Sequence, residues 1–100
     1  MTETVTSRNG VTIRLTDERW SHISEEHAEL AGHKFDVLEA IADAERVVAG
    51  GAGELVALKK QPNGKTLVAV YREDANDGFV ITAFLTRRAA ALNRRKQLWP

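Results

Sequence analysis

The chain has 100 residues, of which 43% are hydrophobic and 28% are charged, a composition typical of one soluble globular domain with a small core. Its 14 bases balance its 14 acids and it has no cysteine, which excludes a disulfide framework and a thiolate zinc site. It has neither the ~20 apolar residues of a membrane helix nor an apolar signal-peptide core. We therefore expect a cytoplasmic protein without membrane contact, and export by a route without a signal peptide stays open.

The first elements predicted along the chain are a strand and two helices. Residues 1–10 are predicted to be frayed and to end in the turn pair Asn9-Gly10. Residues 11–15 alternate between apolar and polar, as a half-buried strand does. Thr16 can cap a helix whose first turn is Asp17-Glu18, since acids suit the positive end of a helix dipole, and Gly32 ends this region. A second helix is predicted from Phe35 to about residue 43.

Strand patterns follow, over residues 46–49, 54–60, 66–73 and 79–86. The pair Asn63-Gly64 predicts a hairpin between the strands over 54–60 and 66–73. Residues 74–78 are predicted to form a further turn. A last helix is predicted from Arg87 to about Lys96, followed by a tail that docks Trp99 on the body. The predicted fold is therefore one α+β domain over 1–100, with N-terminal helices, then a four-stranded antiparallel sheet meander, and a C-terminal helix.

A two-residue loop at Asn63-Gly64 would decide which side chains share a face of the hairpin. One face would carry Leu55, Ala57, Lys59, Val68, Val70 and Arg72, and the other Val56, Leu58, Lys60, Leu67, Ala69 and Tyr71. In the last strand, simple alternation puts Phe79, Ile81, Ala83 and Leu85 in the core and leaves Thr82 as the polar exception on the other face. Both hairpin faces carry apolar residues, so we expect one covered face and one partly covered face.

Two of the three histidines, His22 and His27, lie in or beside the first helix. Histidine is the usual proton shuttle near neutral pH. A spacing of five residues puts the rings roughly 140° apart on a continuous helix, which argues against a zinc pair, since that needs positions four apart on one face. The spacing fits better if the helix ends near Glu26 and His27 lies in the turn beyond. A surface or capping role for either ring stays equally open.

Charge is distributed unevenly along the chain. Residues 1–50 have five bases and ten acids, 5 − 10 = −5, and residues 51–100 have nine bases and four acids, 9 − 4 = +5. A basic half permits a surface that meets phosphate, although an acidic helical layer against a basic sheet edge would show the same pattern. Arg87 and Arg88 lie in the first turn of the predicted last helix, where the dipole disfavours cations, so a salt bridge or a phosphate is expected there.

The chain resembles a known group of nucleases over residues 11 to 99. The series RWSHISEEHAEL, VLEAIADAERVV, GELVALKK, LVAVYRE and GFVITAFLTRR is similar to the phage-barnase-EndoU-colicin-RelE-like domains of the barnase–EndoU–colicin–RelE superfamily. The resemblance implies a metal-independent endoribonuclease without a cofactor, of toxin or phage origin, whose partners are RNA and an antitoxin or immunity protein. Carried onto this chain, the implied catalytic residues are His22, His27, Lys59 or Arg72, and Thr82, while Tyr71 would stack a base or donate a hydrogen bond.

These residue types suit RNA cleavage without a metal. The 2′-hydroxyl attacks its own phosphate, one group takes the 2′ proton and another protonates the leaving 5′ oxygen. His22 and His27 would be the two proton shuttles, in either order. Lys59 and Arg72 would hold the phosphate and Thr82 would orient it, with Arg87 and Arg88 as further RNA contacts. The alternatives are a non-catalytic RNA- or protein-binding module on the same fold, and a domain whose acidic half meets the basic half of a second copy.

Overall fold

The computed structural model describes residues 1–75 and 77–100 and begins with a β-hairpin. Strands β1 (Glu3–Thr6) and β2 (Thr12–Leu15) pair antiparallel. Gly10, at φ +82°, donates its N–H to the Ser7 carbonyl and closes the turn, which suits glycine because it adopts positive φ without steric cost. The prediction that residues 1–10 are frayed is therefore wrong. Val5 packs against the core from β1, and that contact holds the segment.

Three helical segments follow: α1 (Asp17–Glu26), the 3-10 turn η1 (Ala28–Leu30) and α2 (Lys34–Ala42). The Thr16 hydroxyl accepts the Arg19 N–H at 3.0 Å, which confirms the predicted cap. The helix ends at Glu26 and His27 is its C-cap residue, as the histidine spacing predicted. No helix in residues 1–75 or 77–100 is long and apolar enough to cross a membrane.

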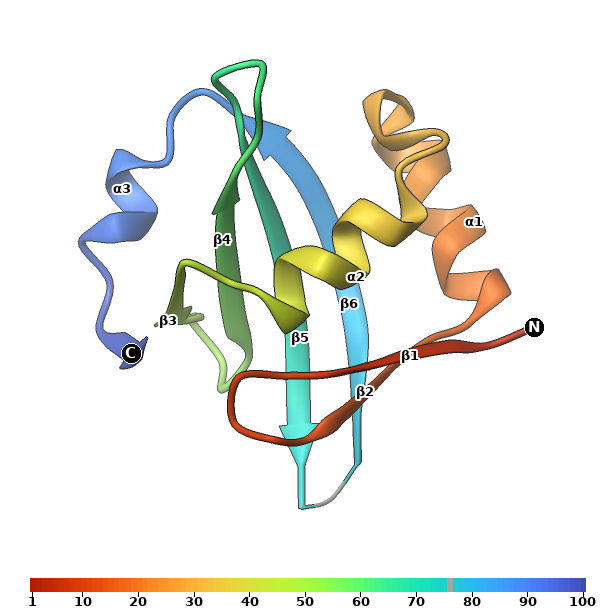
Figure 1. Ribbon diagram of the computed structural model, residues 1–100, viewed down its shortest axis with the longest axis horizontal. Coiled ribbons are helices and arrows are strands. Elements are labelled where there is room, and N and C mark those ends of the chain that lie inside the picture. The colour runs from red at the N-terminus through yellow and green to blue at the C-terminus, as the bar shows by residue number, and fades with distance from the viewer. Residues whose placement is uncertain (76) are drawn as a thin grey trace.

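The remaining strands complete one seven-stranded sheet. They are β3 (Arg46–Ala49), β4 (Leu55–Lys60), β5 (Thr66–Asp74), β6 (Asp77–Thr86) and β7 (Gln97–Trp99). The strand order is β1-β2-β6-β5-β4-β3-β7, and β2 lies parallel to β6 while the other pairs are antiparallel. The predicted fold, with helices first and a four-stranded meander, is thus wrong. The fold is α+β, with a hairpin, two helices and a mixed sheet (Figure 1).

The predicted C-terminal helix over residues 87–96 is reduced to the single turn α3 (Ala90–Asn93). The hydroxyl of Thr86 accepts the Arg88 N–H at 2.9 Å without starting a helix. Beyond α3 the chain becomes extended, and β7 pairs with the outer edge of β3. Trp99 packs against the core, as expected. Hydrogen bonds to the open edge of β3 thus replace the last turns of the predicted helix. Helix propensity is a local quantity and does not include this competing strand pairing.

The two faces of the sheet differ in what lies on them. The covered face packs against α1 and α2, with a core that includes Ile13, Ile41, Leu67, Tyr71 and Val80, all at most 1% exposed. Figure 1 shows α2 crossing this face and α1 lying beside β6. The open face, on the other side, carries a smaller cluster in which Leu92 of α3 packs on β3–β5. One covered and one partly covered face were predicted, and this is confirmed.

The predicted assignment of side chains to the two faces is wrong. The β4–β5 loop centres on three residues, Pro62, Asn63 and Gly64, because Gln61 N–H donates to the Lys65 carbonyl and Gly64 N–H to the Gln61 carbonyl. Gly64 adopts φ +81°, as in hairpins where a type I turn precedes a left-handed residue. The extra loop residue shifts the register by one, so Leu55 faces Tyr71 and Val56 faces Val70. A one-residue shift moves β5 side chains to the opposite face.

A β-bulge alters β6 in the same way. Val70 pairs with Thr82 and Tyr71 pairs with Val80, which leaves Ile81 as the extra residue. Val80 and Ala83 are therefore buried in the core, whereas Phe79 is 37% exposed. Phe79, Ile81, Ala83 and Leu85 were all predicted to lie in the core. Only Ala83 and Leu85 do so. The predicted turn over residues 74–78 includes Asn76, which lies outside the described residues, while Asp74 and Asp77 on either side of it pair.

Candidate nucleic-acid interface

Three directly opposed residues form a row across the open face. Arg14 of β2 pairs with Phe79 of β6, which in turn pairs with Arg72 of β5. Directly opposed residues share a face, so the exposed ring of Phe79 lies between two guanidinium-bearing side chains. A hollow of about 200 Å³ beside the ring is lined by Arg14, Arg19 and Phe79. The row thus combines an accessible aromatic ring with two cations, and Arg19 of α1 adds a third beside the hollow.

Partners on the protein hold the two arginines of this row. Arg14 Nη2 lies 3.2 Å from the Asp77 carboxylate, in an ion pair whose side chains are 44% and 63% exposed. Arg72 Nη2 donates to the Ala52 carbonyl at 3.0 Å, in the loop between β3 and β4. One ion pair for Arg14 and one hydrogen bond for Arg72 leave donors for a ligand, since a guanidinium has five. Both cations are therefore oriented and still accessible.

A second part of the open face lies further along β6. Thr82 and Phe84 point the same way as Phe79, because they pair with Val70 and Val68 of β5. The ring of His27 packs on Phe84, with centroids 5.9 Å apart and planes tilted by 34°. A hollow of about 270 Å³ adjoins this region and includes Phe84, Leu92 and Arg95 in its lining. The open face thus presents two phenylalanines with a hydroxyl between them.

Glu54 brings a negative charge to the rim of this face. Its carboxylate accepts the Ala52 N–H at 2.7 Å. That main-chain hydrogen bond, helped by the positive charges of Arg72 and Arg95, lowers the pKa of Glu54. The carboxylate is therefore ionised at neutral pH and orders the glycine-rich loop against both arginines. Its charge partly offsets theirs, so a polyanion meets a face with moderate positive charge.

The structure separates His22 from His27. His22 Nε2 lies 2.8 Å from Glu26 Oε1 on the exposed surface of α1, whereas His27 Nδ1 lies 3.7 Å from Glu29 Oε2 and packs on Phe84. Among residues 1–75 and 77–100, no hydrogen bond or ring contact links the two imidazoles. The third histidine, His33, is the N-cap residue of α2. Of the pair, His27 is the histidine that contacts the open face.

The other predicted site residues divide between the two faces. Lys59 lies on the covered side, where its Nζ is 3.5 Å from Glu39 of α2, and Arg72 lies on the open side. Tyr71 is buried, and its ring has no exposed side on which a base could stack. Thr82 shares the open face with Arg72. The structure thus puts Arg72 and Thr82 on one face, and His27 contacts Phe84, which lies further along β6 on that face.

The two arginines after β6, Arg87 and Arg88, are exposed at the end of the sheet. The guanidinium of Arg87 lies beside Gly64 in the β4–β5 hairpin. Both arginines precede the single turn of α3, so the dipole of a long helix does not oppose them. They extend the basic surface toward the hairpin end of the open face.

The sequence did not single out Phe79, Phe84, Arg14 or Arg95 as functional. Phe79 and Phe84 are five residues apart in one strand, so simple alternation assigns them to opposite faces. The bulge at Ile81 puts both on the open face. The sequence did indicate that Arg14 points to solvent, because it lies between the buried residues Ile13 and Leu15 in β2. That Arg14 lies next to Phe79 could not be predicted, because it depends on the pairing of two strands far apart in the sequence.

Comparisons with known proteins add no assignment: no family model, no curated protein and no solved structure matches the chain. The resemblance to the barnase–EndoU–colicin–RelE superfamily therefore stays a prediction, as does the antitoxin or immunity partner that it implies. The cytoplasmic location expected from the sequence also stays a prediction. Within the described part of the chain, no three acidic or histidine side chains gather closely enough to hold a metal ion.

Proposed function

We propose that the protein binds single-stranded RNA on the open face of its sheet. The observation that carries the proposal is the row Arg14–Phe79–Arg72, in which an exposed ring lies between two cations on three adjacent strands. Sequence-specific and single-strand RNA binding commonly uses bases stacked on aromatic side chains of a sheet, with arginines on the phosphates. A second ring, Phe84, lies further along the same strand and offers a second stacking position.

The geometry favours a single strand over a duplex. Stacking on Phe79 or Phe84 requires an unpaired base whose π-face is free, and both rings lie on strand backbone rather than on a protruding loop or helix. Arg14 and Arg72 flank the first ring, where they can contact the phosphates on either side of a stacked base. The RNA strand therefore runs along β6, with bases on the rings and phosphates on the flanking cations.

The binding test compares two basic residues on opposite faces of the same sheet. Labelled single-stranded RNA is titrated with wild type, Arg72→Ala and Lys59→Ala while fluorescence anisotropy is recorded at several salt concentrations. Arg72→Ala is expected to weaken binding about tenfold, the effect of one charge-assisted contact, and Lys59→Ala to leave affinity unchanged. Absence of RNA binding by wild type, or equal loss in both variants, would contradict the proposal.

A second candidate function, cleavage of the bound RNA, is favoured by the contact of His27 with Phe84. A strand stacked on Phe84 would bring a sugar and its phosphate beside this imidazole. The 2′-oxygen would attack its own phosphorus as His27 takes the 2′ proton, and the bond to the 5′ oxygen would break as that oxygen receives a proton from a second acid or from water. Glu29 near His27 Nδ1 would orient the imidazole, and Arg72 and Thr82 share the face on which negative charge develops.

The cleavage test uses total RNA with a chelator and maps the ends of the products. Wild type is expected to give 2′,3′-cyclic phosphate ends, and His27→Ala to lose about 10²–10⁴-fold in rate, the usual contribution of one acid or base. His22→Ala, also on α1 but paired with Glu26, decides whether the second predicted shuttle takes part. RNA that stays intact, or is cut equally by the double histidine variant, would leave binding as the only function. A 2′-deoxy substitution at the cut site should abolish cleavage and preserve binding.

A further inference from the structure

Two hairpin loops of this chain share one backbone conformation and one dipeptide. The β1–β2 loop contains Asn9-Gly10 and the β4–β5 loop contains Asn63-Gly64, with the glycines at φ +82° and +81°. In each loop the entering residue donates its N–H to the carbonyl four residues further on, at 2.8 Å in both, and the glycine N–H donates to the carbonyl of that entering residue, at 2.9 and 3.1 Å. A difference in reactivity between the two asparagines must therefore come from their side-chain contacts.

An Asn-Gly pair can react within itself, because glycine has no Cβ to shield its amide nitrogen. Hydroxide removes the glycine N–H proton and the nitrogen attacks Cγ of the asparagine. A C–N bond forms, the bond from Cγ to the side-chain nitrogen breaks, and that nitrogen takes a proton from water and leaves as ammonia. Water then opens the resulting succinimide ring at either carbonyl and breaks one C–N bond. The product is an aspartyl or isoaspartyl residue, so an amide is replaced by a carboxylate.

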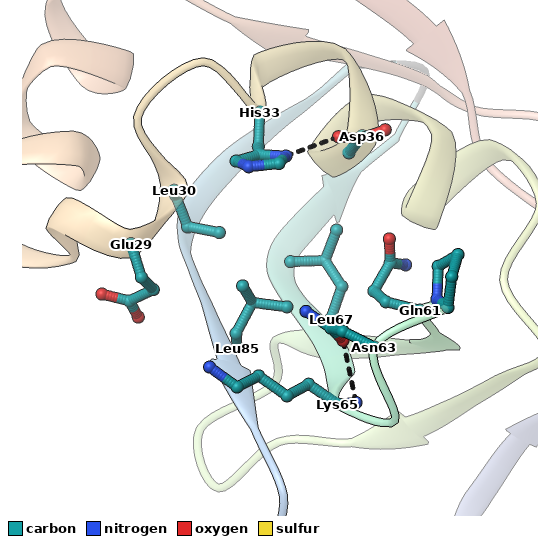
Figure 2. A pocket seen from close by; sticks show the side chains of 10 residues that line it. Glu29, Leu30, His33, Asp36, Gln61, Asn63, Lys65, Leu67 and Leu85 are labelled. Carbon is teal, nitrogen blue, oxygen red and sulfur yellow. Dashed lines mark hydrogen bonds and ion pairs between the residues drawn. The ribbon is translucent and has the colours of Figure 1, made fainter.

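The contacts of Asn63 favour this reaction. Its Oδ1 accepts the Lys65 main-chain N–H at 3.0 Å (dashed line in Figure 2), an Asx turn that folds the side chain back over the Gly64 amide. The attacking nitrogen and Cγ are thus held close together before reaction. The same N–H stabilises the negative charge that Oδ1 gains during the attack. Asn63 is exposed and lines a hollow of about 480 Å³, so water reaches the amide group that leaves.

The contacts of Asn9 oppose the reaction. Its Nδ2 donates to Glu73 Oε1 at 3.0 Å, and the other oxygen of that carboxylate accepts the Ser7 hydroxyl. The Val11 N–H, which corresponds in position to the Lys65 N–H, donates to Ser7 Oγ at 3.3 Å instead of to Asn9. The Asn9 side chain is therefore directed to β5, its leaving nitrogen is bound, and a negative charge lies beside the group that would become anionic.

We propose that Asn63 is a site of spontaneous deamidation and that Glu73 protects Asn9 from the same reaction. The reaction puts a carboxylate in the β4–β5 loop, where the guanidinium of Arg87 lies beside Gly64. The new charge offsets part of the basic surface that extends from the open face to this loop. One consequence rests on the proposed function: affinity for single-stranded RNA falls by up to about fivefold, the size of one exposed charge interaction.

The experiment incubates the full chain in mildly alkaline buffer and follows both sites by peptide mapping with mass spectrometry, which detects the exchange of an amide for a carboxyl group. Product is expected at Asn63 well before Asn9. In urea that unfolds the chain, the two rates should converge, because the hairpin contacts are lost. Glu73→Ala frees the Asn9 amide and should raise the rate at Asn9, with Asn63 of the same molecules as internal control. Should this variant not fold, the wild-type comparison decides alone.

The consequence for RNA is measured on variants that do not need ageing. Asn63→Asp carries the new charge permanently and should weaken binding of single-stranded RNA, most strongly at low salt. Asn63→Gln, which keeps an uncharged amide, is the matched control and should bind as wild type does. Equal losses of affinity in both variants, or none in Asn63→Asp, would overturn the consequence.

The outcomes for the site and for the proposed function are distinguishable. Equal rates at the two asparagines of the folded chain, a faster rate at Asn9, or absence of product at Asn63 overturns the deamidation site and leaves RNA binding through Arg72 untouched. Absence of RNA binding by wild type overturns the proposed function, whereas preferential reaction at Asn63 in the folded chain still supports the site.

Discussion

The two faces of one sheet have opposite characters although they alternate along the same strands. On the covered face Leu67 and Tyr71 of β5 are at most 1% exposed and pack under α2. On the open face Arg72 of the same strand and Phe79 of β6 remain accessible. The first set stabilises the fold through buried apolar area, and the second presents rings and cations to solvent. Stability and binding are therefore expected to respond to different substitutions.

The largest effect is expected from a cavity in the covered core. Ile41→Ala, at a position with 0% exposure, should lower the free energy of unfolding by about 2–5 kcal/mol. RNA affinity of the folded fraction should change less than about twofold, because Ile41 is remote from the open face. Urea unfolding measures the first quantity and anisotropy the second. A specific loss of RNA affinity without loss of stability would break the division between the faces.

The next effect concerns affinity rather than stability. Phe79→Ala removes the ring of the cross-strand row and should weaken binding of single-stranded RNA by roughly tenfold to a hundredfold, the usual value of one base–aromatic stack. Its free energy of unfolding should fall by only about 1 kcal/mol. Phe35→Ala is the matched control, since Phe35 is 69% exposed on α2. Equal losses of affinity in the two variants would locate binding elsewhere.

A smaller effect is expected at Tyr71, whose buried hydroxyl has no hydrogen-bond partner among the described residues. Tyr71→Phe removes that unsatisfied group and should raise the free energy of unfolding by about 1 kcal/mol. RNA affinity should be unchanged. A destabilisation above that size would show that the hydroxyl has a bonding partner such as an internal water.

The same residue makes stability depend on alkaline pH. Burial, followed by the nearby charge of Glu73, raises the pKa of Tyr71 well above its usual range. The unfolded chain loses this proton near pH ~10 while the folded chain keeps it, so the unfolded state binds fewer protons above that pH. The contribution of Tyr71 to the free energy of unfolding is therefore fully present below pH ~10 and is lost progressively as the pH rises above that value. Tyr71 is the one tyrosine of the chain, so ultraviolet absorbance of tyrosinate should appear only together with unfolding.

The smallest effect compares two adjacent lysines. Lys60 pairs with Thr66 and faces the open side, whereas Lys59 lies near Glu39 on the covered side. Lys60→Ala should reduce the salt dependence of RNA binding by about one phosphate contact, and Lys59→Ala should leave the slope unchanged. Affinity measured at three or more salt concentrations gives both slopes. A steeper loss for Lys59→Ala would reverse the assignment of the faces.

Local signals in the sequence predicted the elements between residues 11 and 86, but not those at the two ends of the chain. The Thr16 cap, the end of α1 before His27 and the β3–β6 strands follow from capping residues and apolar alternation. The hairpin of β1 and β2 was missed because Val5 is the only apolar side chain in β1, although the Asn9-Gly10 turn was recognised. Pairing of β7 with β3 was missed because it depends on a distant open strand edge.

The site was harder to predict because two one-residue irregularities decide which side chains face out. A three-residue loop at Pro62–Gly64 shifts β5 against β4, and the bulge at Ile81 shifts the first half of β6 against the second. Either shift moves side chains to the opposite face. Lys59 was therefore grouped wrongly with Arg72, and Phe79 was assigned to the core. Thr82 and Arg72 still lie on the open face, as their proposed roles require.

Phenylalanine-selective NMR tests the central claim most directly. The chain has three phenylalanines: two on the open face, Phe79 and Phe84, and one on α2, Phe35. When single-stranded RNA is added, we expect the ring signals of Phe79 and Phe84 to move upfield under the ring current of stacked bases, while those of Phe35 stay in place. Shifts at Phe35 with none at Phe79 or Phe84 would contradict it.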